Sequence, residues 1–190
     1  MRTIAFLGSP RRNGNSELLL NEAIKGVEAS GSEVRVFNLN LLETKPCQNC
    51  GGCDETGVCV LDDDMSDIYK EIRSADRFIL ASPIFFFGLS AQSKTMIDRC
   101  QCFWCEKYVL KKPLPEGEYG RKGLLFIVGG LKKEIGVDCA AATAKAFFRT
   151  ISVKEHKTLS FLGIDAKAAI LDHPTALRDA FEAGKGLVSL

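Results

Sequence analysis

The sequence has almost no net charge and very little histidine. Its 25 lysines and arginines face 24 aspartates and glutamates, which leaves a formal charge of +1 over 190 residues. A chain without a basic excess lacks the electrostatic footprint of a nucleic-acid binder, so we expect no nucleic-acid partner. His156 and His173 stand apart, without a pattern of cysteines or carboxylates around them. A histidine-rich metal site or a histidine-based hydrolase is therefore not expected.

Long apolar runs and a secretion signal are also missing. The longest apolar stretch, residues 78–91, is too short for a membrane span and contains Pro83 and Gly88. No cleavage site follows Met1, which leads directly into a strand-like run. We therefore expect a cytoplasmic protein in a reduced environment, without membrane contact. With 46% hydrophobic residues, the chain has enough apolar material for one core, so residues 1–190 are expected to form a single domain.

Three common motifs for binding and catalysis are absent. Gly8 and Gly14 are separated by five residues and followed by Asn15, so the spacing and the lysine of an NTPase P-loop are missing. No G-x-G-x-x-G fingerprint follows the first strand, and no G-x-S-x-G elbow occurs anywhere. The chain therefore lacks the marks of an NTPase, a Rossmann-type dinucleotide protein and an α/β-hydrolase.

Strand-like apolar runs alternate with helical patterns along the chain. The expected strands are residues 4–7, 34–37, 77–81, 124–128 and 159–162. The expected helices cover about residues 16–30, 62–74, 90–106, 138–151 and 175–187. This alternation predicts an α/β three-layer sandwich with a parallel sheet. Five strands in one short domain favour the flavodoxin-like strand order 2-1-3-4-5.

The loop after the first strand has the composition of an anion site. Residues 8–16 are rich in glycine and small polar side chains, and they precede a helix that Asn15 or Ser16 can cap. Free N–H groups at a helix start, together with the helix dipole, favour a phosphate, although a plain polar turn is the simpler alternative. Because neutral donors dominate, a monophosphate fits best. The expected phosphate ligands are Ser9, Arg11, Asn13, Asn15 and Ser16.

The loop after the third strand is aromatic. Residues 85–87 are three consecutive phenylalanines, which can form an apolar wall for a flat ring, although at least one of them can serve core packing alone. Two glycines end the fourth strand at the same edge of the sheet and let a ring approach the backbone. A phosphate site, an apolar slot and bare backbone at one edge suggest FMN. The expected flavin-lining residues are Pro83, Ile84, Phe85, Phe86, Gly88, Gly129 and Gly130.

Four of the eight cysteines form the pattern C-x2-C-x2-C-x5-C. They lie in an insertion after the second strand, residues 41–61, that has no clear periodicity. Three thiolates at two-residue gaps can surround one face of a [4Fe–4S] cluster while a fourth closes it. The expected ligands are Cys47, Cys50, Cys53 and Cys59. Zinc is the rival, although structural zinc usually takes two separated knuckles, and reduced thiols without a metal are the third possibility.

The remaining candidates have simpler interpretations. Cys100, Cys102 and Cys105 share one expected helix, and Cys139 lies on another. A second metal site would need two further ligands beside Cys102 and Cys105, so we expect these four thiols to pack as small hydrophobic side chains. The acidic run 62–64 is expected to cap the helix that follows it.

Two of these motifs resemble a known family. Residues 8–16 (Gly-Ser-Pro-Arg, then Gly-Asn-Ser) resemble the FMN phosphate loop of NAD(P)H-dependent FMN-reductase-type flavodoxin-like proteins. Residues 46–65 (Pro46 with the four cysteines, Gly57 and Asp63-Asp64-Met65) resemble the compact cysteine motif of the iron-sulfur flavoproteins. Residues 81–99 (Ala-Ser-Pro, Lys94 and Asp98-Arg99) fit the same family, so the resemblance covers about residues 3–188.

The resemblance implies an FMN protein with a [4Fe–4S] cluster that assembles as a homo-oligomer, a dimer or a tetramer. It further implies electron exchange with a ferredoxin-like donor or NAD(P)H, and a cysteine loop close to a subunit contact. Many relatives carry tyrosine where Phe85 stands, so any flavin hydrogen bond from that phenol must come from elsewhere here.

These features together predict an FMN-dependent oxidoreductase that transfers electrons and needs no catalytic acid, base or nucleophile of its own. Two alternatives remain open at this point. One is a cluster-free NAD(P)H-dependent FMN or quinone reductase. The other is a zinc-stabilised binding module without enzymatic activity.

Overall fold

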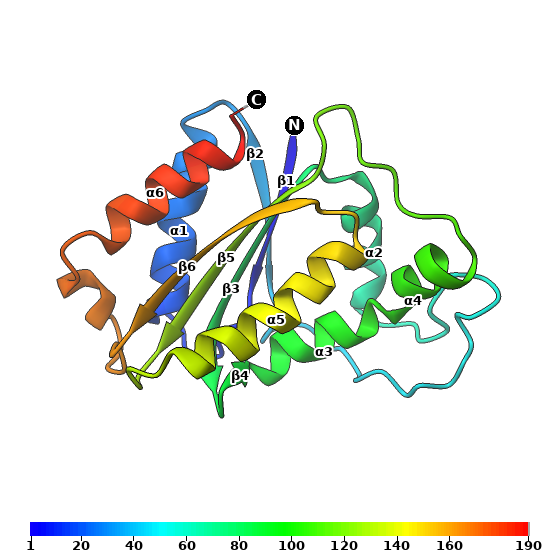
Figure 1. The fold of residues 1–190 in the computed structure, drawn as a ribbon, viewed down its shortest axis with the longest axis horizontal. Coiled ribbons are helices and arrows are strands. Elements are labelled where there is room, and N and C mark those ends of the chain that lie inside the picture. The colour runs from blue at the N-terminus through cyan, green and yellow to red at the C-terminus, as the bar shows by residue number, and fades with distance from the viewer. Residues whose placement is uncertain (190) are drawn as a thin grey trace.

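A computed structural model of the chain describes residues 1–189 and shows a central sheet with helices on both faces (Figure 1). The five long strands are parallel: β1 Arg2–Leu7, β2 Glu33–Asn38, β3 Arg77–Phe85, β5 Lys122–Gly129 and β6 Glu155–Leu162. They pair in the order β2-β1-β3-β5-β6, which confirms the predicted order for five parallel strands. A short sixth strand, β4 (Gly88–Leu89), pairs antiparallel with β3 in a segment that was expected to be a loop.

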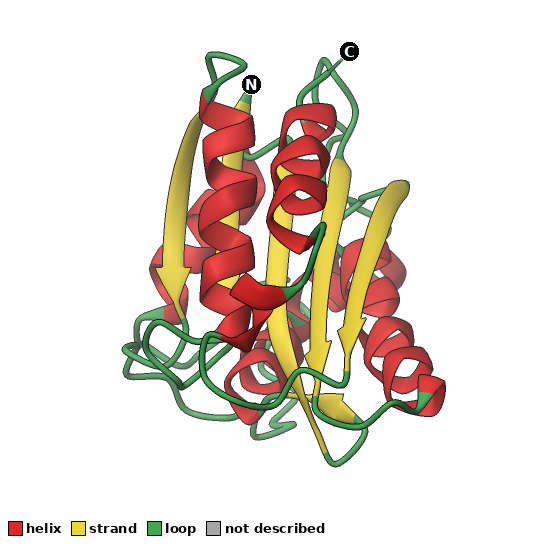
Figure 2. Cartoon of the chain, turned by 90° about the vertical axis from the view of Figure 1, so that its left-hand side faces the viewer, coloured by secondary structure: helices red, strands yellow, loops and turns green. Residues whose placement is uncertain are grey.

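The helices form the two outer layers of the sandwich. One face of the sheet is covered by α1 (Asn15–Glu28) and α6 (Ala176–Leu187), which lie side by side in Figure 2. The other face is covered by α2 (Met65–Ser74), α3 (Ala91–Arg99) and α5 (Glu134–Thr150). The apolar side chains of each layer form a separate buried cluster against the sheet, so the strands are buried from both sides.

Two glycines explain how closely α1 and α6 pack. A Cβ atom on Gly26 would lie 2.1 Å from the carbonyl oxygen of Phe181, and one on Gly184 would lie 2.0 Å from the carbonyl oxygen of Ala23. Both distances are impossible for real atoms, so any larger side chain at either position forces the helices apart. This contact holds α1, whose first turn opens onto the ligand edge of the sheet, in a fixed position.

The helix expected over residues 90–106 is interrupted. Helix α3 ends at Arg99, and a single turn of α-helix, α4 (Gln101–Trp104), then passes into a π-helical turn, η1 (Cys105–Val109). In that turn the N–H of Leu110 donates to the carbonyl oxygen of Cys105, five residues earlier, at 2.9 Å. A short 3-10 helix, η2 (Ala169–Asp172), also lies in a segment for which the sequence predicted no element.

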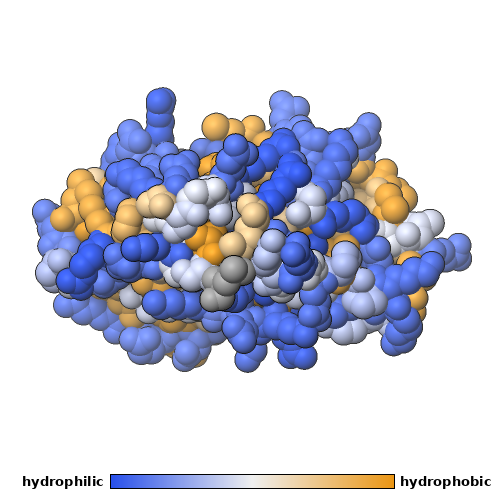
Figure 3. All heavy atoms as spheres, turned by 90° about the horizontal axis from the view of Figure 1, so that it is seen from above, coloured by the Kyte–Doolittle hydropathy of each residue, from blue (hydrophilic) through white to orange (hydrophobic). Residues whose placement is uncertain are grey.

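The two ends of the sheet have different character. The carboxyl ends of the strands point to one edge, at the bottom of Figures 1 and 2, where the loops after β1, β3, β5 and β6 gather. The opposite end carries both chain termini, and Figure 3 shows a surface of mostly hydrophilic side chains there. Within residues 1–189, no helix is both long and apolar enough to cross a membrane. The edge with the loops is therefore the part of the fold where a ligand site is expected.

Candidate functional site

A hollow in two connected parts lies at the carboxyl edge of the sheet. The part at the start of α1 is lined chiefly by Ser9, Arg11, Gly14, Asn15, Ser16, Pro83, Ile84, Phe85, Gly130, Ile164 and Asp165. The part beside the β3–β4 hairpin has a volume of about 490 Å³ and is lined by Ile84, Phe85, Phe86, Phe87, Gly129, Gly130, Leu131, Lys133, Gly136 and Asp165. Ile84, Phe85, Gly130 and Asp165 line both parts. The volume is typical of a small-molecule pocket.

The narrow part has the features of an anion site. Gly14, not Asn15 or Ser16 as expected, occupies the N-cap of α1, and no side chain caps the helix. A Cβ atom at this glycine would lie 2.8 Å from the carbonyl oxygen of Arg11, so the tight loop excludes a capping side chain. The first N–H groups of the helix therefore keep no side-chain acceptor, and the positive end of the helix dipole opens onto the hollow.

Some of the predicted phosphate ligands face the hollow, whereas others form hydrogen bonds elsewhere. Ser9 and Ser16 are buried at the lining, and Arg11 reaches across the hollow to donate to the carbonyl oxygen of Asp165 at 2.9 Å. The amide of Asn15 is engaged elsewhere: it donates to the carbonyl oxygen of Ala166 at 2.9 Å and accepts from the N–H of Ile170 at 3.1 Å. Its side chain fastens the segment after β6 beneath the site.

Two predicted residues lie outside the lining of either part. Asn13 is exposed, has a φ of 53°, and donates its backbone N–H to the carboxylate of Glu17 at 2.5 Å. Gly88 pairs with Phe85 in the β3–β4 hairpin. The other ten predicted cofactor residues line one or both parts of the hollow.

Several lining residues were missed from the sequence. They are chiefly Leu131, Lys133, Gly136, Ile164 and Asp165, while Gly14 and Phe87 belong to loops that were predicted to bind but were not named as ligands. Asp165 and Ile164 follow β6, and its carboxyl end must lie at the same edge as those of the other parallel strands. The loop after the last strand could therefore have been predicted to line the site, because the strand order alone places it at this edge.

The β3–β4 hairpin carries unusual backbone strain. Phe86 and Phe87 form its two-residue turn with φ angles of 49° and 62°, between the paired residues Phe85 and Gly88. Such a turn favours asparagine and glycine, because other side chains clash with their own backbone at positive φ. The side chain of Phe86 is nevertheless fully exposed, while Phe85 and Phe87 are about half exposed. Strain retained at exposed aromatic residues indicates a functional constraint on this hairpin.

The cysteine loop is fastened to the fold by one buried ion pair. The guanidinium of Arg99 pairs with the carboxylate of Asp63 through contacts of 2.6 and 3.1 Å, and both side chains are buried. Arg99 also donates to the carbonyl oxygen of Lys45 at 2.7 Å and to the Sγ of Cys59 at 3.5 Å. Asp63 was expected only as a helix-capping residue. It accepts from the backbone N–H of Met65 at 3.1 Å, but its main partner is this arginine.

The four motif cysteines line one small hollow. Cys102 from α4 lines it too, beside Cys47, Cys50, Cys53 and Cys59. Two glycines of the loop, Gly51 and Gly57, have φ angles of 73° and 69°, which a residue with a side chain rarely adopts. The enclosed volume is about 30 Å³, room for one water-sized group.

The thiols of this region differ in acidity. Burial raises the pKa of Cys59, but hydrogen bonds from the Leu61 backbone, Tyr69 and Arg99 outweigh it, so this pKa lies below the ordinary value. Burial, and then the neighbouring Cys59, raise the pKa of Cys102 to about 12. Arg99 therefore supports one thiolate directly, and that thiolate belongs to a predicted ligand.

Cys102 and Cys105 are buried, as expected of packing thiols, but they also contact the cysteine loop. Cys102 faces the motif thiols, and the Sγ of Cys105 lies 3.7 Å from that of Cys53. Cys100 is buried, as expected of a packing thiol, whereas Cys139 is exposed on α5 and was wrongly expected in the core.

A parallel sheet in this order, with an uncapped helix start and an aromatic slot at its carboxyl edge, defines a flavodoxin-like α/β protein. The chain belongs to the family described as NADPH-dependent FMN reductase, which matches residues 1–159. This match confirms the predicted family.

Relatives of similar sequence carry the name iron-sulfur flavoprotein. One from Archaeoglobus fulgidus is 35% identical over 133 residues, which are 70% of this chain and 57% of the relative. One from Methanocaldococcus jannaschii is 41% identical over 99 residues, 52% of this chain and 51% of the relative. The matched part thus spans little more than half the length of these curated relatives.

Solved structures of low sequence identity share the fold. An NAD(P)H:quinone oxidoreductase from Methanothermobacter marburgensis superposes with a TM-score of 0.74 at 16% identity, over 100% of this chain and 97% of the other. An FMN-dependent NADH-azoreductase from Bacillus anthracis, solved in complex with FMN, gives 0.68 at 12% identity over 100% of both chains. These likenesses support the fold of the whole chain.

Proposed function

We propose that the protein is an FMN-dependent electron-transfer oxidoreductase that also holds a [4Fe–4S] cluster on its cysteine loop. The observation that carries this proposal is that four motif cysteines line one hollow, with a buried arginine directed at one of them, in a fold that also has an apolar slot at the carboxyl edge of its sheet. The names of the relatives support the same combination.

The residues at the carboxyl edge fit FMN. The uncapped start of α1, with Ser9 and Ser16 buried beside it, supplies neutral donors for a monophosphate, and Arg11 is the nearest cation. The slot beside Phe85 and Gly130 is apolar and large enough for a flat ring system. Bound there, FMN supplies one-electron and two-electron chemistry, while the chain positions it and limits access of water.

The donor set of the cysteine loop fits an iron-sulfur cluster. Four thiols in a compact loop are its usual ligands, and the Arg99 guanidinium offsets part of the negative charge that four thiolates bring. The hollow as it stands holds about 30 Å³, so a cluster requires the loop to widen. Cys50 is already exposed at the edge of the hollow, where widening of the loop meets least packing. Bound there, the cluster supplies one-electron transfer.

The flavin slot and the cysteine hollow share no lining residue. The loop lies beside α3 and α4, at the lower right of Figure 1, whereas the β3–β4 hairpin lies at the lower centre. We therefore propose a homo-oligomer, a dimer or a tetramer, in which the cysteine loop of one subunit approaches the flavin of another. A ferredoxin-like protein or NAD(P)H serves as the electron donor in this proposal.

One anaerobic preparation tests these points together. The protein is expressed with iron supplied, purified without oxygen, and analysed for flavin, iron, sulfide and zinc beside its absorption spectrum. We expect FMN together with about four iron and four sulfide per chain. Flavin without iron would leave a cluster-free NAD(P)H-dependent FMN or quinone reductase. Stoichiometric zinc without flavin would instead indicate a binding module and overturn both redox functions.

A further inference from the structure

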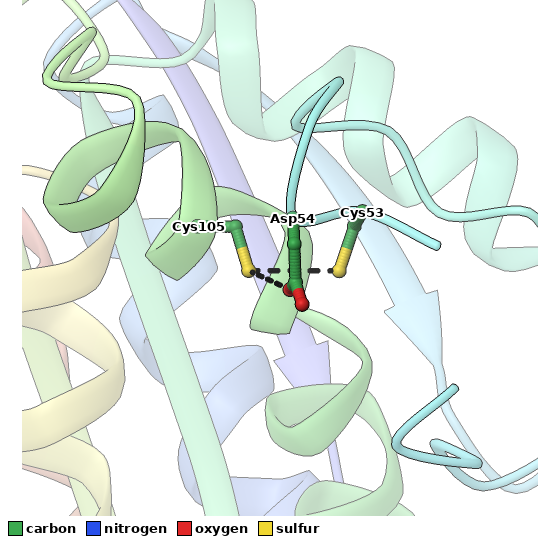
Figure 4. A group of neighbouring side chains, drawn as sticks. All are labelled: Cys53, Asp54 and Cys105. Carbon is green, nitrogen blue, oxygen red and sulfur yellow. Dashed lines mark hydrogen bonds between the residues drawn. The ribbon is translucent and has the colours of Figure 1, made fainter. Parts of the chain in front are cut away.

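Three potential metal ligands converge where the cysteine loop meets the end of α4. The Sγ of Cys105 lies 3.7 Å from the Sγ of Cys53 and 3.2 Å from Oδ1 of Asp54. The three ligand atoms all lie within 4.8 Å of one another. Figure 4 shows the side chains of Cys53 and Asp54 coming from the loop and that of Cys105 coming from the helix, all directed to one point.

These distances are those of a tetrahedral metal site. Two thiolates at about 2.3 Å from zinc lie about 3.8 Å apart in a tetrahedron, and a thiolate and a carboxylate oxygen lie about 3.5 Å apart. The observed separations of 3.7 and 3.2 Å lie within about 0.3 Å of these two edges. The third separation, from Cys53 to Asp54, is no more than 4.8 Å, and Asp54 is exposed, so its side chain has room to adjust.

The charges around the three groups favour a cation. Cys105 is completely buried, and its thiol contacts a second thiol and donates to the carboxylate of Asp54 at 3.2 Å. Within residues 1–189, Asp54 forms no ion pair, and the nearby guanidinium of Arg99 is directed at Asp63 and Cys59 instead. A divalent cation would displace the protons of both thiols and take the place of the thiol proton beside the Asp54 carboxylate.

The local backbone presents Cys105 to this point. Cys105 is the first residue of the π-helical turn, a rare geometry that is frequently found at functional sites. Gln101, one helical turn earlier, places its side-chain amide 3.7 Å from the Cys105 Sγ, so a polar group already orients the thiol. Two elements distant in sequence thus supply one ligand set.

We propose that the cluster-free protein binds one thiophilic divalent cation, Zn²⁺ or Fe²⁺, through Cys53, Asp54 and Cys105, with water at the fourth position. The site is distinct from the four-cysteine set, but it shares Cys53 with it. The cation and the cluster therefore cannot be bound at the same time. Cys105 is a ligand in the cation-bound state only. The proposal holds whether or not the protein ever carries a cluster.

Cobalt titration of the cluster-free full-length protein tests this site. After removal of metals with a chelator under anaerobic conditions, Co²⁺ is added and followed by its thiolate charge-transfer band and by the visible bands of tetrahedral cobalt. We expect one cobalt per chain, displacement by Zn²⁺, and release of about two protons per cation, because both thiols must deprotonate.

Four variants separate this site from the cluster site. Cys105→Ser and Asp54→Asn should each weaken cobalt binding about tenfold or more, and Asp54 is exposed, so its variant should fold without difficulty. Cys50→Ser should keep cobalt binding but lose the cluster after reconstitution. Cys139→Ser, which changes an exposed thiol on α5, is the matched control and should behave as the wild type.

The outcomes are distinct. Wild-type protein that binds no cobalt, or Cys105→Ser and Asp54→Asn variants that bind it with unchanged affinity and spectrum, would overturn the site. Loss of cobalt binding in Cys50→Ser would place the cation on the four motif cysteines instead. Iron and sulfide content after anaerobic reconstitution reports separately on the proposed cluster, so failure of one proposal is not failure of the other.

Discussion

Neutralising Asp63 should reveal how strongly the buried ion pair holds the cysteine loop. The side chain of Arg99 is 0% exposed and that of Asp63 is 8% exposed, and their contacts of 2.6 and 3.1 Å form a fork. Asp63→Asn keeps the shape but leaves the buried guanidinium without its countercharge. Breaking a buried pair in this way typically costs about 3–5 kcal/mol, a large share of the roughly 5–15 kcal/mol that stabilises a domain.

Part of this loss should be local to the loop. Arg99 donates to the carbonyl oxygen of Lys45 and to the Sγ of Cys59, which lie at the two ends of the cysteine motif. If the guanidinium moves, the loop loses its contacts at both ends. Urea denaturation measures the global change, and the rate at which Cys59 reacts with a thiol reagent, mapped by mass spectrometry, measures the local one. The matched control is Asp98→Asn, because Asp98 pairs with Lys94 on the surface, where such a pair contributes about 0–1 kcal/mol.

The pH dependence gives a second measure of the same pair. Burial raises the pKa of Asp63, but hydrogen bonds from Arg99 and from two backbone N–H groups outweigh it and hold this pKa below its ordinary value of 3.8. A carboxyl with a depressed pKa in the folded state contributes stability above its unfolded pKa and loses it as the pH falls through the folded value. The wild type should therefore lose stability more steeply than Asp63→Asn as the pH falls below about 3.8.

Two results would refute this reasoning about Asp63. One is a cost below about 1 kcal/mol, the range of an exposed pair, with Cys59 no more reactive than in the wild type. The other is strict additivity of Asp63→Asn and Arg99→Gln in a double-mutant cycle, since residues in direct contact should show a coupling of about 0.5–3 kcal/mol.

Three further predictions concern the hairpin, the phosphate site and the cluster. Replacing Phe86 by Asn and Phe87 by Gly should raise the free energy of unfolding by about 1–2 kcal/mol while weakening FMN binding, as seen by thermal denaturation and flavin titration. Replacing Arg11 and Ser16 by alanine should weaken FMN more than riboflavin, because only FMN has the phosphate; equal losses would contradict the phosphate role. Cys50→Ala should lose iron yet retain FMN, and full iron content would show that the ligand set is wrong.

The strand order of the sheet was predictable because it follows from the positions of the apolar runs and from the handedness of the connections between them. Buried parallel strands appear as short apolar runs, and the right-handed crossovers between them leave little choice of order. The hairpin strand β4 was not predictable. Phe86 and Phe87 occupy a turn that normally shows asparagine and glycine, so nothing in the sequence indicates a turn there.

The break after Arg99 and the role of Cys105 were hidden for a related reason. Apolar spacing over residues 90–106 fits one continuous helix, and a shift from i+4 to i+5 hydrogen bonding leaves no mark in that pattern. With an unbroken helix, Cys105 is one more small apolar residue. Its contact with Cys53, 52 residues earlier, depends on how the cysteine loop folds back, and the loop has no periodicity from which to infer this.

The three buried arginines, Arg77, Arg99 and Arg121, differ in the groups that compensate their charge. Arg77 and Arg121 donate to backbone carbonyl oxygens, form no ion pair within residues 1–189, and have pKa values that burial lowers. Burial also acts to lower the pKa of Arg99, but Asp63 and Cys59 reverse the effect. Asp63 supplies one negative charge to Arg99, and a thiolate at Cys59 supplies a second, so this guanidinium stabilises the ionised form of a thiol that a metal would need as a ligand. The position of this arginine therefore supports the metal-binding loop that we propose.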